Sequence, residues 1–412
     1  MSTAFSNALS GLNANSLAID TVSGNLANLN TTGYMDNQVS FQDLLTGVNT
    51  QSNTGVSGSV VAQTASQFSQ GTLTTTGQPY DAAIQGNGFF VLNAPSGQQS
   101  FTREGDFTVS SSGELLGAGG ENVQGWNAAG GTLSTSGATG NIVLPVSGSQ
   151  QPVATANMTI STNLSSNTAV NGTFSSPIQV YDAQGTAHTL TATYTETSAN
   201  NWSYNVTIPA ADVGATGAPV VVGSGTLTFN GSGQLITPAL TDPPSAIAIT
   251  GLTDGASDMA INWNFYDSQG TPTITQLSEA SSNLATHQDG TAPGQLTGTS
   301  IGANGQISAT YSNGSSVVVA QIALASVLNP DSMQNLGNNT FSVTSATAAP
   351  IIGTSSTGSR GQISGGALES STVDIATEFT NLLTYERGYQ ANSKVITTED
   401  DIMQSTIGLI QQ

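Results

Sequence analysis

The chain contains no cysteine, which excludes disulfides, thiol nucleophiles and cysteine-ligated metal sites. Basic residues are almost as scarce, with four Lys or Arg against 25 Asp or Glu and a formal net charge of -21. Nucleic-acid binding needs a basic surface, and anionic membranes attract basic segments, so neither partner is expected. Charged residues form only 7% of the chain. We therefore expect a surface made mostly of Ser, Thr, Asn, Gln and Gly.

Long apolar runs and catalytic patterns are missing as well. No stretch approaches the roughly 18 apolar residues of a membrane-spanning helix, so membrane insertion is not expected. The first residues contain neither a basic residue nor an apolar block, and they predict no secretory signal peptide. No Ser/His/Asp grouping, metal-ligand cluster or phosphate-binding loop can be recognised. The sequence therefore predicts no enzyme, no cofactor and no metal site.

Two isolated polar residues are interpreted as structural. His188 follows a turn at 182–185 and is interpreted as a lone polar residue of a strand. Arg103 is the only basic residue before Arg360, and its neighbours Glu104 and Asp106 predict an ion pair within a hairpin.

Each end of the chain carries a seven-residue apolar repeat, which predicts helices that pack along their length against other helices. One helix is expected over residues 2–30, and another begins near a capping pattern formed by Ser371 and Asp374. The first is rich in Ser, Asn and Thr and contains Gly11 and Gly24, so we expect it to be ordered only against a partner. The predicted interface positions are Phe5, Leu12, Ile19, Val22, Leu26, Leu29, Ile375, Phe379, Leu382, Tyr389, Ile396, Met403 and Ile410, and the C-terminal repeat starts at Leu368.

The middle of the chain is predicted to be β-structure. Apolar residues alternate with polar ones over 202–208 and 259–265, which predicts sheets with one buried face. Asn304-Gly305 and Asn313-Gly314 predict tight turns between strands. The Gly-, Ser- and Thr-rich segments before and after this region lack a steady period and are interpreted as extended connectors.

The predicted fold class is mixed, with a terminal α-helical coiled-coil domain and two mainly-β domains nested in the chain. The expected boundaries are 1–32 and 367–412 for the helical domain, 33–70 and 345–366 for the connectors, 71–145 and 285–344 for the first β domain, and 146–284 for the second β domain.

Several motifs resemble those of bacterial flagellar rod and hook proteins, and they occur in order along nearly the whole chain. They are the segments 25–34 (NLANLNTTGY), 68–71 (FSQG), 81–90 (DAAIQGNGFF), 101–107 (FTREGDF), 366–370 (GALES) and 389–396 (YQANSKVI). The chain departs from the usual family pattern at Asp36, where a basic residue is common nearby, and at Thr372, where Asn is common. A second β domain gives the chain the length of a hook protein rather than that of the shorter rod proteins.

The resemblance implies a subunit of the flagellar hook, the curved extracellular tube between rod and filament. The terminal helices would form the inner tube, the first β domain a middle shell and the second β domain an outer shell. Implied partners are other copies of the chain, the distal rod protein, the hook cap, the hook–filament junction proteins and the flagellar type III export apparatus. Arg387 and Lys394 lie on the side of the last helix away from its apolar stripe. They are candidates to meet acidic groups of neighbouring copies, or they lie on a solvated face.

An alternative class of function is a surface adhesin or carbohydrate-binding module, since an acidic β protein rich in Ser and Thr fits that class as well. It leaves the paired terminal repeats unexplained. Electron microscopy of the purified protein would separate tubes from monodisperse particles that bind glycans.

Overall fold

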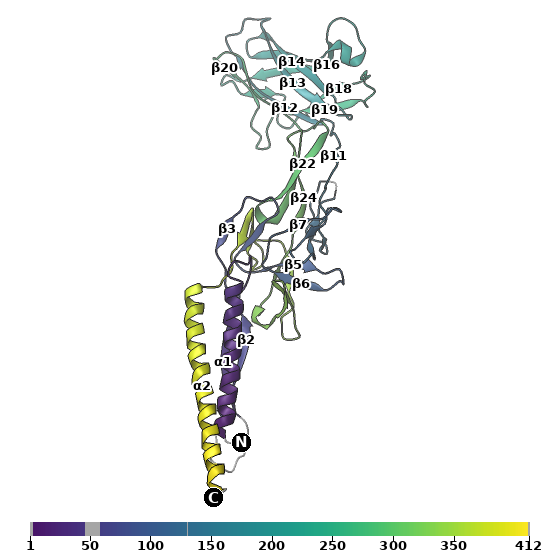
Figure 1. The fold of residues 1–412 in the computed structure, drawn as a ribbon. Coiled ribbons are helices and arrows are strands. Elements are labelled where there is room, and N and C mark those ends of the chain that lie inside the picture. Colours follow the sequence, from purple (N-terminus) through teal and green to yellow (C-terminus); the bar gives the residue numbers. More distant parts are fainter. Residues whose placement is uncertain (1–2, 46–57, 130, 411–412) are drawn as a thin grey trace. The chain divides into compact units, whose positions relative to one another are not determined.

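The computed structural model of the protein describes residues 3–45, 58–129 and 131–410. Helices at both ends flank a mainly β middle, as the sequence predicted (Figure 1). The chain divides into two compact units. Unit 1 comprises Met1–Val146, Thr299–Ala309 and Val317–Gln412, and unit 2 comprises Ser147–Gly298 and Thr310–Ser316. None of the described helices has the length and apolar character needed to cross a membrane.

Two long helices form one end of unit 1. Helix α1 (Thr3–Ala27) ends three residues earlier than predicted, because the chain turns over residues 28–33 and Gly33 takes a φ of 65°. Leu29 therefore lies beyond the helix. Helix α2 (Ile375–Ile410) begins where the Asp374 carboxylate accepts the Thr377 backbone N–H at 2.8 Å, an N-cap. Leu368 belongs to a strand, so the helical repeat starts one period later than predicted.

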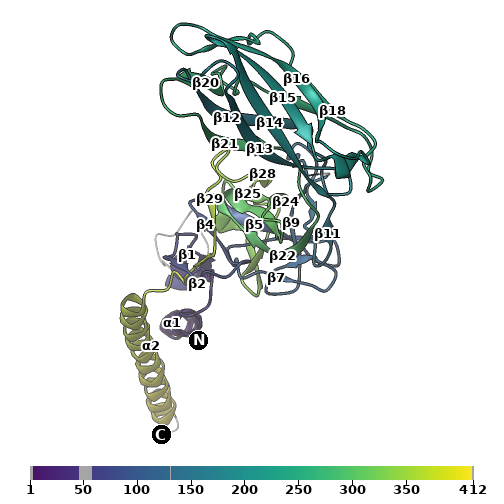
Figure 2. The same cartoon turned by 90° about the horizontal axis from the view of Figure 1, so that it is seen from above.

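The segment predicted as an extended connector at 33–70 instead contains a β-hairpin. Strands β1 (Asn37–Leu45) and β2 (Gly58–Ser66) are antiparallel, with Asn37 opposite Ser66. The hairpin lies beside α1 (Figure 2), and the Val60 backbone N–H donates to Ser10 Oγ at 3.2 Å. The second predicted connector, 345–366, contains β28 (Ile351–Gly353) and β29 (Gln362–Gly365). Glycine- and serine-rich composition obscured these strands, of which β29 pairs with the distant residues 82–85.

The β part of unit 1 is built around one sheet whose strands differ in length. Its path includes β22-β23-β24-β9-β5-β6-β27-β26, in which the first residues of β22 belong to unit 2, and β25 pairs with both β5 and β28. Phe90, Leu92 and Ile322 are among its fully buried core residues. The remaining elements are β3 (Leu73–Thr75), β4 (Ala82–Gln85), β5 (Phe89–Asn93), β6 (Gln99–Thr102), β7 (Thr108–Val109), β8 (Leu115–Leu116), β9 (Asn122–Asn127), β10 (Gly140–Asn141), β22 (Gly294–Ile301), η2 (Ala303–Gly305), β23 (Gln306–Tyr311), β24 (Ser316–Ile322), β25 (Leu324–Ser326), η3 (Pro330–Ser332), β26 (Gln334–Gly337), β27 (Thr340–Ser342) and β30 (Ala367–Glu369).

Unit 2 contains two five-stranded sheets that share one core. The predicted alternation is confirmed, since Trp202, Tyr204, Val206 and Ile208 are all buried. One sheet has the order β13-β14-β15-β16-β17, and the other runs β18-β19-β12-β20 with β21 paired to β12. The elements are β11 (Ser149–Gln150), β12 (Asn157–Ser165), β13 (Thr173–Tyr181), β14 (Ala187–Ser198), β15 (Asn201–Ile208), η1 (Ala210–Val213), β16 (Val220–Phe229), β17 (Leu235–Thr237), β18 (Ser245–Ile249), β19 (Met259–Trp263), β20 (Ile274–Leu277) and β21 (Ser282–Gln288).

Two features of unit 2 differ from the sequence interpretation. The expected boundary between residues 284 and 285 falls inside β21, and unit 2 continues to Gly298. His188 is not a lone polar residue, because Asp182, Asp212 and Asp254 surround its imidazole. The fold collects these side chains from three segments, and no local sequence pattern connects them.

Candidate functional site

The two terminal helices pack side by side and run in opposite directions (Figure 1). The buried face of α1 consists mostly of small residues, rather than of the large apolar residues of the predicted stripe. Its buried positions are Ala8, Ala14, Ala18, Val22 and Asn25. Small side chains allow the helix backbones to approach each other closely, and they leave the larger residues on the flanks.

Two glycine–asparagine contacts set the register of the helix pair. A Cβ atom added at Gly11 would lie 2.9 Å from the Asn392 amide, and one added at Gly388 would lie 2.5 Å from Asn15 Oδ1. Each asparagine also donates to the carbonyl oxygen of the glycine on its own helix, Asn15 to Gly11 at 2.7 Å and Asn392 to Gly388 at 2.9 Å. The Gly-x3-Asn spacing occurs in both helices. It was the sequence signal for this interface, and the sequence interpretation treated Gly11 only as a helix-weakening residue.

A buried amide, Asn25, joins the end of α1 to the starts of β1 and α2. Its Oδ1 accepts the Asn37 backbone N–H at 3.0 Å and the Tyr34 hydroxyl at 3.1 Å. Its Nδ2 donates to the Asn37 carbonyl at 2.8 Å and to Glu378 Oε1 at 3.2 Å. All four hydrogen-bonding positions of the side chain are therefore used. This network, which we call the junction, explains the structural role of the 25–34 motif.

The two residues that depart from the family pattern, Asp36 and Thr372, contact each other beside the junction. The Thr372 hydroxyl donates to Asp36 Oδ1 at 2.8 Å and accepts the Asp36 backbone N–H at 2.9 Å. The Thr372 backbone N–H also donates to the Tyr34 carbonyl at 3.1 Å. These bonds tie the segment after α1 to the segment before α2.

Glu378 makes the junction sensitive to pH. Burial raises the pKa of its carboxyl above the ordinary 4.5, the Asn25 hydrogen bond lowers it, and the nearby Asp36 and Asp374 raise it. The folded state therefore holds this proton more tightly than the unfolded state, and the contribution of Glu378 to stability increases as pH falls from neutral towards 4.5. In Glu378→Gln we expect a smaller gain in stability between pH 7 and pH 5 than in the parent protein. Urea unfolding of the monomer, followed by helical circular dichroism, measures it.

The matched control is Glu386→Gln, which changes an exposed glutamate on the same helix. It is expected to keep the parent pH dependence. An unchanged pH dependence in Glu378→Gln would show that the junction carboxyl does not titrate between the folded and unfolded states as described.

Arg103 forms a buried ion pair, but its partner is neither Glu104 nor Asp106. Its Nη1 lies 3.2 Å from Oε2 of Glu369, which is 266 residues away in sequence, and its Nη2 donates to the Gly86 carbonyl at 2.8 Å. The prediction that Arg103 pairs with Glu104 or Asp106 is therefore wrong. The sequence interpretation considered neighbours only, whereas the actual partner lies in β30, the last strand before α2.

The predicted interface residues fall into three groups. Val22 is buried, and Ile375, Phe379, Tyr389 and Met403 are more than one-third exposed. The partly buried ones are Phe5, Leu12, Ile19, Leu26, Leu29, Leu382 and Ile396. The side chain of Ile410 lies outside the described residues. Leu383, which was not predicted, is 56% exposed and lies four residues after Phe379.

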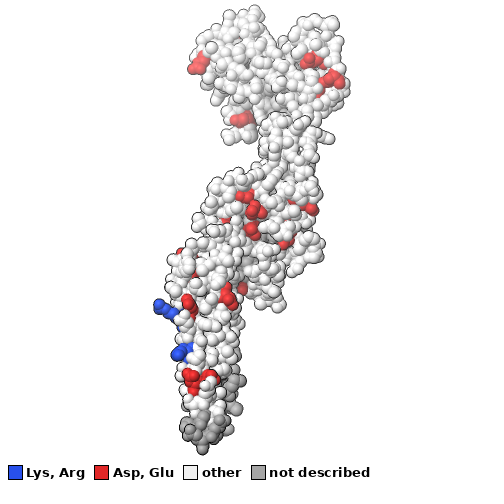
Figure 3. Space-filling view, in the orientation of Figure 1, with Lys and Arg blue, Asp and Glu red and all other residues white. Residues whose placement is uncertain are grey.

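The basic side chains of α2 are also exposed. Neither Arg387 nor Lys394 has an ion-pair partner among the residues that the structure describes. On the face shown in Figure 3, the blue basic atoms lie over the helical part of unit 1, whereas red acidic atoms also occur over the β regions. The exposed cations are therefore concentrated on the helix that also exposes apolar side chains.

Comparisons with known proteins match almost the whole chain. Family models match residues 5–34 (flagella basal body rod protein), 83–168 (flagellar hook protein FlgE/F/G D1 domain), 152–291 (flagellar basal body protein FlaE D2 domain) and 364–409 (flagellar basal body rod FlgEFG protein C-terminal). The flagellar hook protein FlgE of Escherichia coli is 31% identical, over 98% of this chain and 100% of its own. That of Salmonella typhimurium is 32% identical, over 98% and 99%, and that of Rhizobium meliloti 33%, over 97% of both chains.

The crystal structure of Helicobacter pylori flagellar hook protein FlgE2 has a similar fold. It aligns with a TM-score of 0.54 and 14% sequence identity, and the match covers 71% of this chain and 99% of that one. The identity and coverage of the full-length relatives, with four flagellar models matched in order, establish the family. The chain belongs to the flagellar hook protein FlgE family.

Proposed function

We propose that copies of this chain join through their terminal helices, so that neighbouring copies cover the apolar residues that α2 exposes in the monomer. Membership of the family makes the chain a structural, non-enzymatic subunit of the flagellar hook. The hook is an extracellular tube that transmits motor torque from rod to filament. What we propose is the surface by which the subunits hold together.

The row of exposed apolar side chains along α2 carries this proposal. Ile375, Phe379 and Leu383 follow each other at four-residue spacing and are 46%, 52% and 56% exposed. This spacing places them on one flank of the helix. Ile402 and Ile407 are 56% and 53% exposed near the other end of α2. Contiguous exposed apolar surface of this kind marks an interaction site.

A second copy of the chain is the occupant that fits this row. Helix α2 has 36 residues and α1 has 25, so α1 cannot cover α2 along its whole length. An open tube needs heterologous contacts, in which one face of each copy meets a different face of the next. Exposed apolar flanks on both helices suit such contacts, since Leu9 and Leu17 of α1 are 43% and 40% exposed.

We extend the proposal to the other predicted assignments. The helices would form a coiled-coil inner tube, in which Arg387 and Lys394 meet acidic groups of neighbouring copies. The β part of unit 1 would form the middle shell, and unit 2, nested in the chain, the outer shell. The distal rod protein, hook cap, hook–filament junction proteins and type III export apparatus are the proposed partners.

Labelling of single cysteines tests the interface, since the chain has no cysteine of its own. In Leu383→Cys, we expect the thiol to react with a maleimide in the monomer and to be protected in assembled tubes. The control is Leu284→Cys in β21, where Leu284 is 69% exposed, and we expect it to react in both states. Equal reactivity of the Leu383→Cys thiol in tubes and monomers would exclude this flank of α2 from the interface. Electron microscopy of the same samples verifies the tubes.

A further inference from the structure

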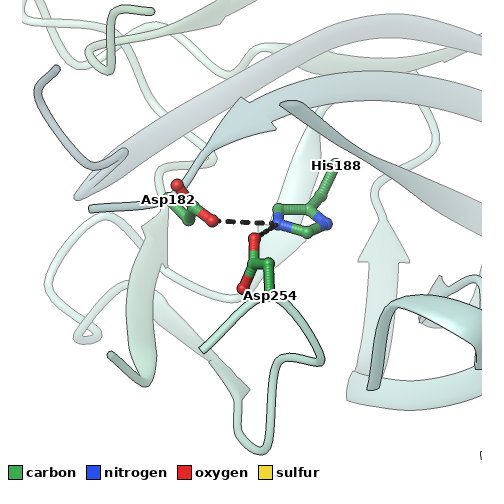
Figure 4. Close-up of side chains that lie close together, drawn as sticks. All are labelled: Asp182, His188 and Asp254. Atoms are coloured by element: carbon green, nitrogen blue, oxygen red, sulfur yellow. Dashed lines mark hydrogen bonds and ion pairs between the residues drawn. The ribbon is translucent and has the colours of Figure 1, made fainter. Parts of the chain in front are cut away.

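One histidine and three carboxylates converge in unit 2, far in sequence from the terminal helices. Asp182 lies in the turn between β13 and β14, and His188 is the second residue of β14. Asp212 belongs to η1, and Asp254 lies in the loop between β18 and β19. Figure 4 shows Asp182, His188 and Asp254 pointing toward one another. The side chains of Asp182 and His188 are 0% and 6% exposed, whereas Asp212 and Asp254 are about a quarter exposed.

Main-chain hydrogen bonds hold two of the carboxylates in place by one oxygen each. Asp182 Oδ1 accepts the backbone N–H groups of Gln184 and Thr186, both at 2.8 Å, and Asp254 Oδ1 accepts that of Ala256 at 3.0 Å. The other oxygen of each carboxylate faces the imidazole. Asp182 Oδ2 lies 3.4 Å and Asp254 Oδ2 lies 3.7 Å from His188 Nε2. One possible ligand atom from each of Asp182, His188 and Asp254 lies within 4.8 Å of the other two.

The opposite side of the imidazole is held as well. His188 Nδ1 lies 2.9 Å from Asp212 Oδ2, a hydrogen-bond contact that holds the imidazole so that Nε2 faces the other two carboxylates. Metal-bound histidines are commonly oriented by a carboxylate in this way.

The charge of the cluster favours a bound cation. Residues 147–298 contain no lysine and no arginine. A fully buried carboxylate such as Asp182 requires a positive partner, because burying an unpaired charge is strongly unfavourable. A proton on His188 would offset only one of the three carboxylates, and the unit has no lysine or arginine to offset the others.

We propose that this cluster binds a divalent transition-metal ion, with Zn²⁺ the best match, through His188 Nε2, Asp182 Oδ2 and Asp254 Oδ2. Zn²⁺ is bound tetrahedrally by nitrogen and carboxylate oxygen at about 2.0–2.1 Å, which places ligand atoms about 3.3–3.4 Å apart. The separations of 3.4 Å and 3.7 Å around Nε2 are close to this value. Asp212 orients the imidazole, and the partial exposure of Asp254 gives the ion and a water ligand access.

The bound ion would connect two sheets. Its ligands come from the β13–β14 turn, which belongs to one sheet, and from the loop between β18 and β19, which belongs to the other. The chain has no cysteine and cannot form a disulfide between these loops. A metal ion that binds residues of both loops would hold them together instead.

Titration of the full-length monomer with ZnCl₂, after removal of metal by a chelator, tests the site. We expect one saturable ion per chain by calorimetry and a higher midpoint of thermal unfolding in the presence of Zn²⁺. Asp254→Asn keeps the oxygen that accepts the Ala256 N–H, so it should fold, and it is expected to weaken Zn²⁺ binding at least about tenfold.

Asp267→Asn is the matched control. Asp267 Oδ1 accepts the N–H groups of Gln269 and Thr271 at 2.9 Å and 2.8 Å, in the same kind of turn as Asp182, but among the described residues Asp267 belongs to no group of possible metal ligands. Its variant should bind Zn²⁺ like the parent protein. The proposal is overturned if the parent shows no saturable binding at millimolar ZnCl₂, if Asp254→Asn binds as tightly as the parent, or if Asp267→Asn loses as much affinity. Tube formation does not enter this test, so its result is independent of the proposed interface.

Discussion

Phe379→Asp is expected to stop polymerisation while the monomer stays folded. Phe379 is 52% exposed in the monomer, so its replacement removes little of the monomer core. In the proposed tube a neighbouring copy covers this side chain. Burial of a phenylalanine contributes about 1.5–3 kcal/mol, and an unpaired carboxylate in the same place adds a further cost. A loss of at least about 3 kcal/mol raises the critical concentration by more than roughly 100-fold.

The measurement is the protein concentration that remains unassembled after sedimentation, with electron microscopy of the pellet. Phe379→Leu keeps an apolar side chain and is expected to assemble with nearly the parent critical concentration. Thr380→Asp introduces the same charge at the next exposed position and should change assembly only modestly. If Phe379→Asp assembles within about threefold of the parent, a difference of less than about 0.7 kcal/mol, the apolar row on α2 is not a subunit interface.

The sequence predicted the two helices, but it did not predict the face that each presents to the other. A seven-residue apolar repeat identifies a helix that packs, but it does not show that a glycine will approach an asparagine closely. Gly11 and Asn392 form such a glycine–asparagine contact, which a hydrophobic repeat does not reveal. Phe379 and Tyr389 of the predicted stripe lie outside this contact and remain exposed, and their packing against other copies stays a prediction.

Contacts between distant segments were the other part that the sequence could not predict. Alternation over 202–208 identified the buried face of β15, because that signal is local. The partner of Arg103 lies 266 residues away, and the carboxylates around His188 come from three different segments. Sequence proximity identifies Asp182 next to His188, but it does not identify Glu369, Asp212 or Asp254, because those pairings depend on how the strands are arranged.

Arg103→Met is expected to destabilise unit 1 by about 3–5 kcal/mol, because it leaves the Glu369 carboxylate buried without a cation. Urea unfolding of the monomer at pH 7 measures this loss. The control Arg387→Met removes an exposed cation from α2 and should change the free energy of unfolding by less than about 0.5 kcal/mol. A loss below about 1 kcal/mol in Arg103→Met would show that the pair is not needed, since an ordinary surface change costs about half of that.

The pH dependence of the stability loss in Arg103→Met shows whether it comes from the unpaired Glu369 carboxylate or from lost packing of the arginine side chain. Burial raises the pKa of Glu369, although Arg103 and the Gly71 N–H lower it, so the carboxyl already favours its neutral form more than a free glutamate does. Without Arg103 this preference grows. The folded state then takes up a proton more readily than the unfolded state, and the loss should shrink as pH falls from 7 towards 5.

The double variant Arg103→Met with Glu369→Gln removes both charges and is expected to recover most of the stability at pH 7. The Glu369 backbone carbonyl accepts the Gly33 N–H at 2.8 Å, and this bond is unaffected by the side-chain change. Gly33 follows α1, and Glu369 precedes α2. The ion pair therefore holds the point at which both terminal helices leave the β part of unit 1. Arg103→Met should consequently reduce assembly as well as stability, and the double variant should restore both together.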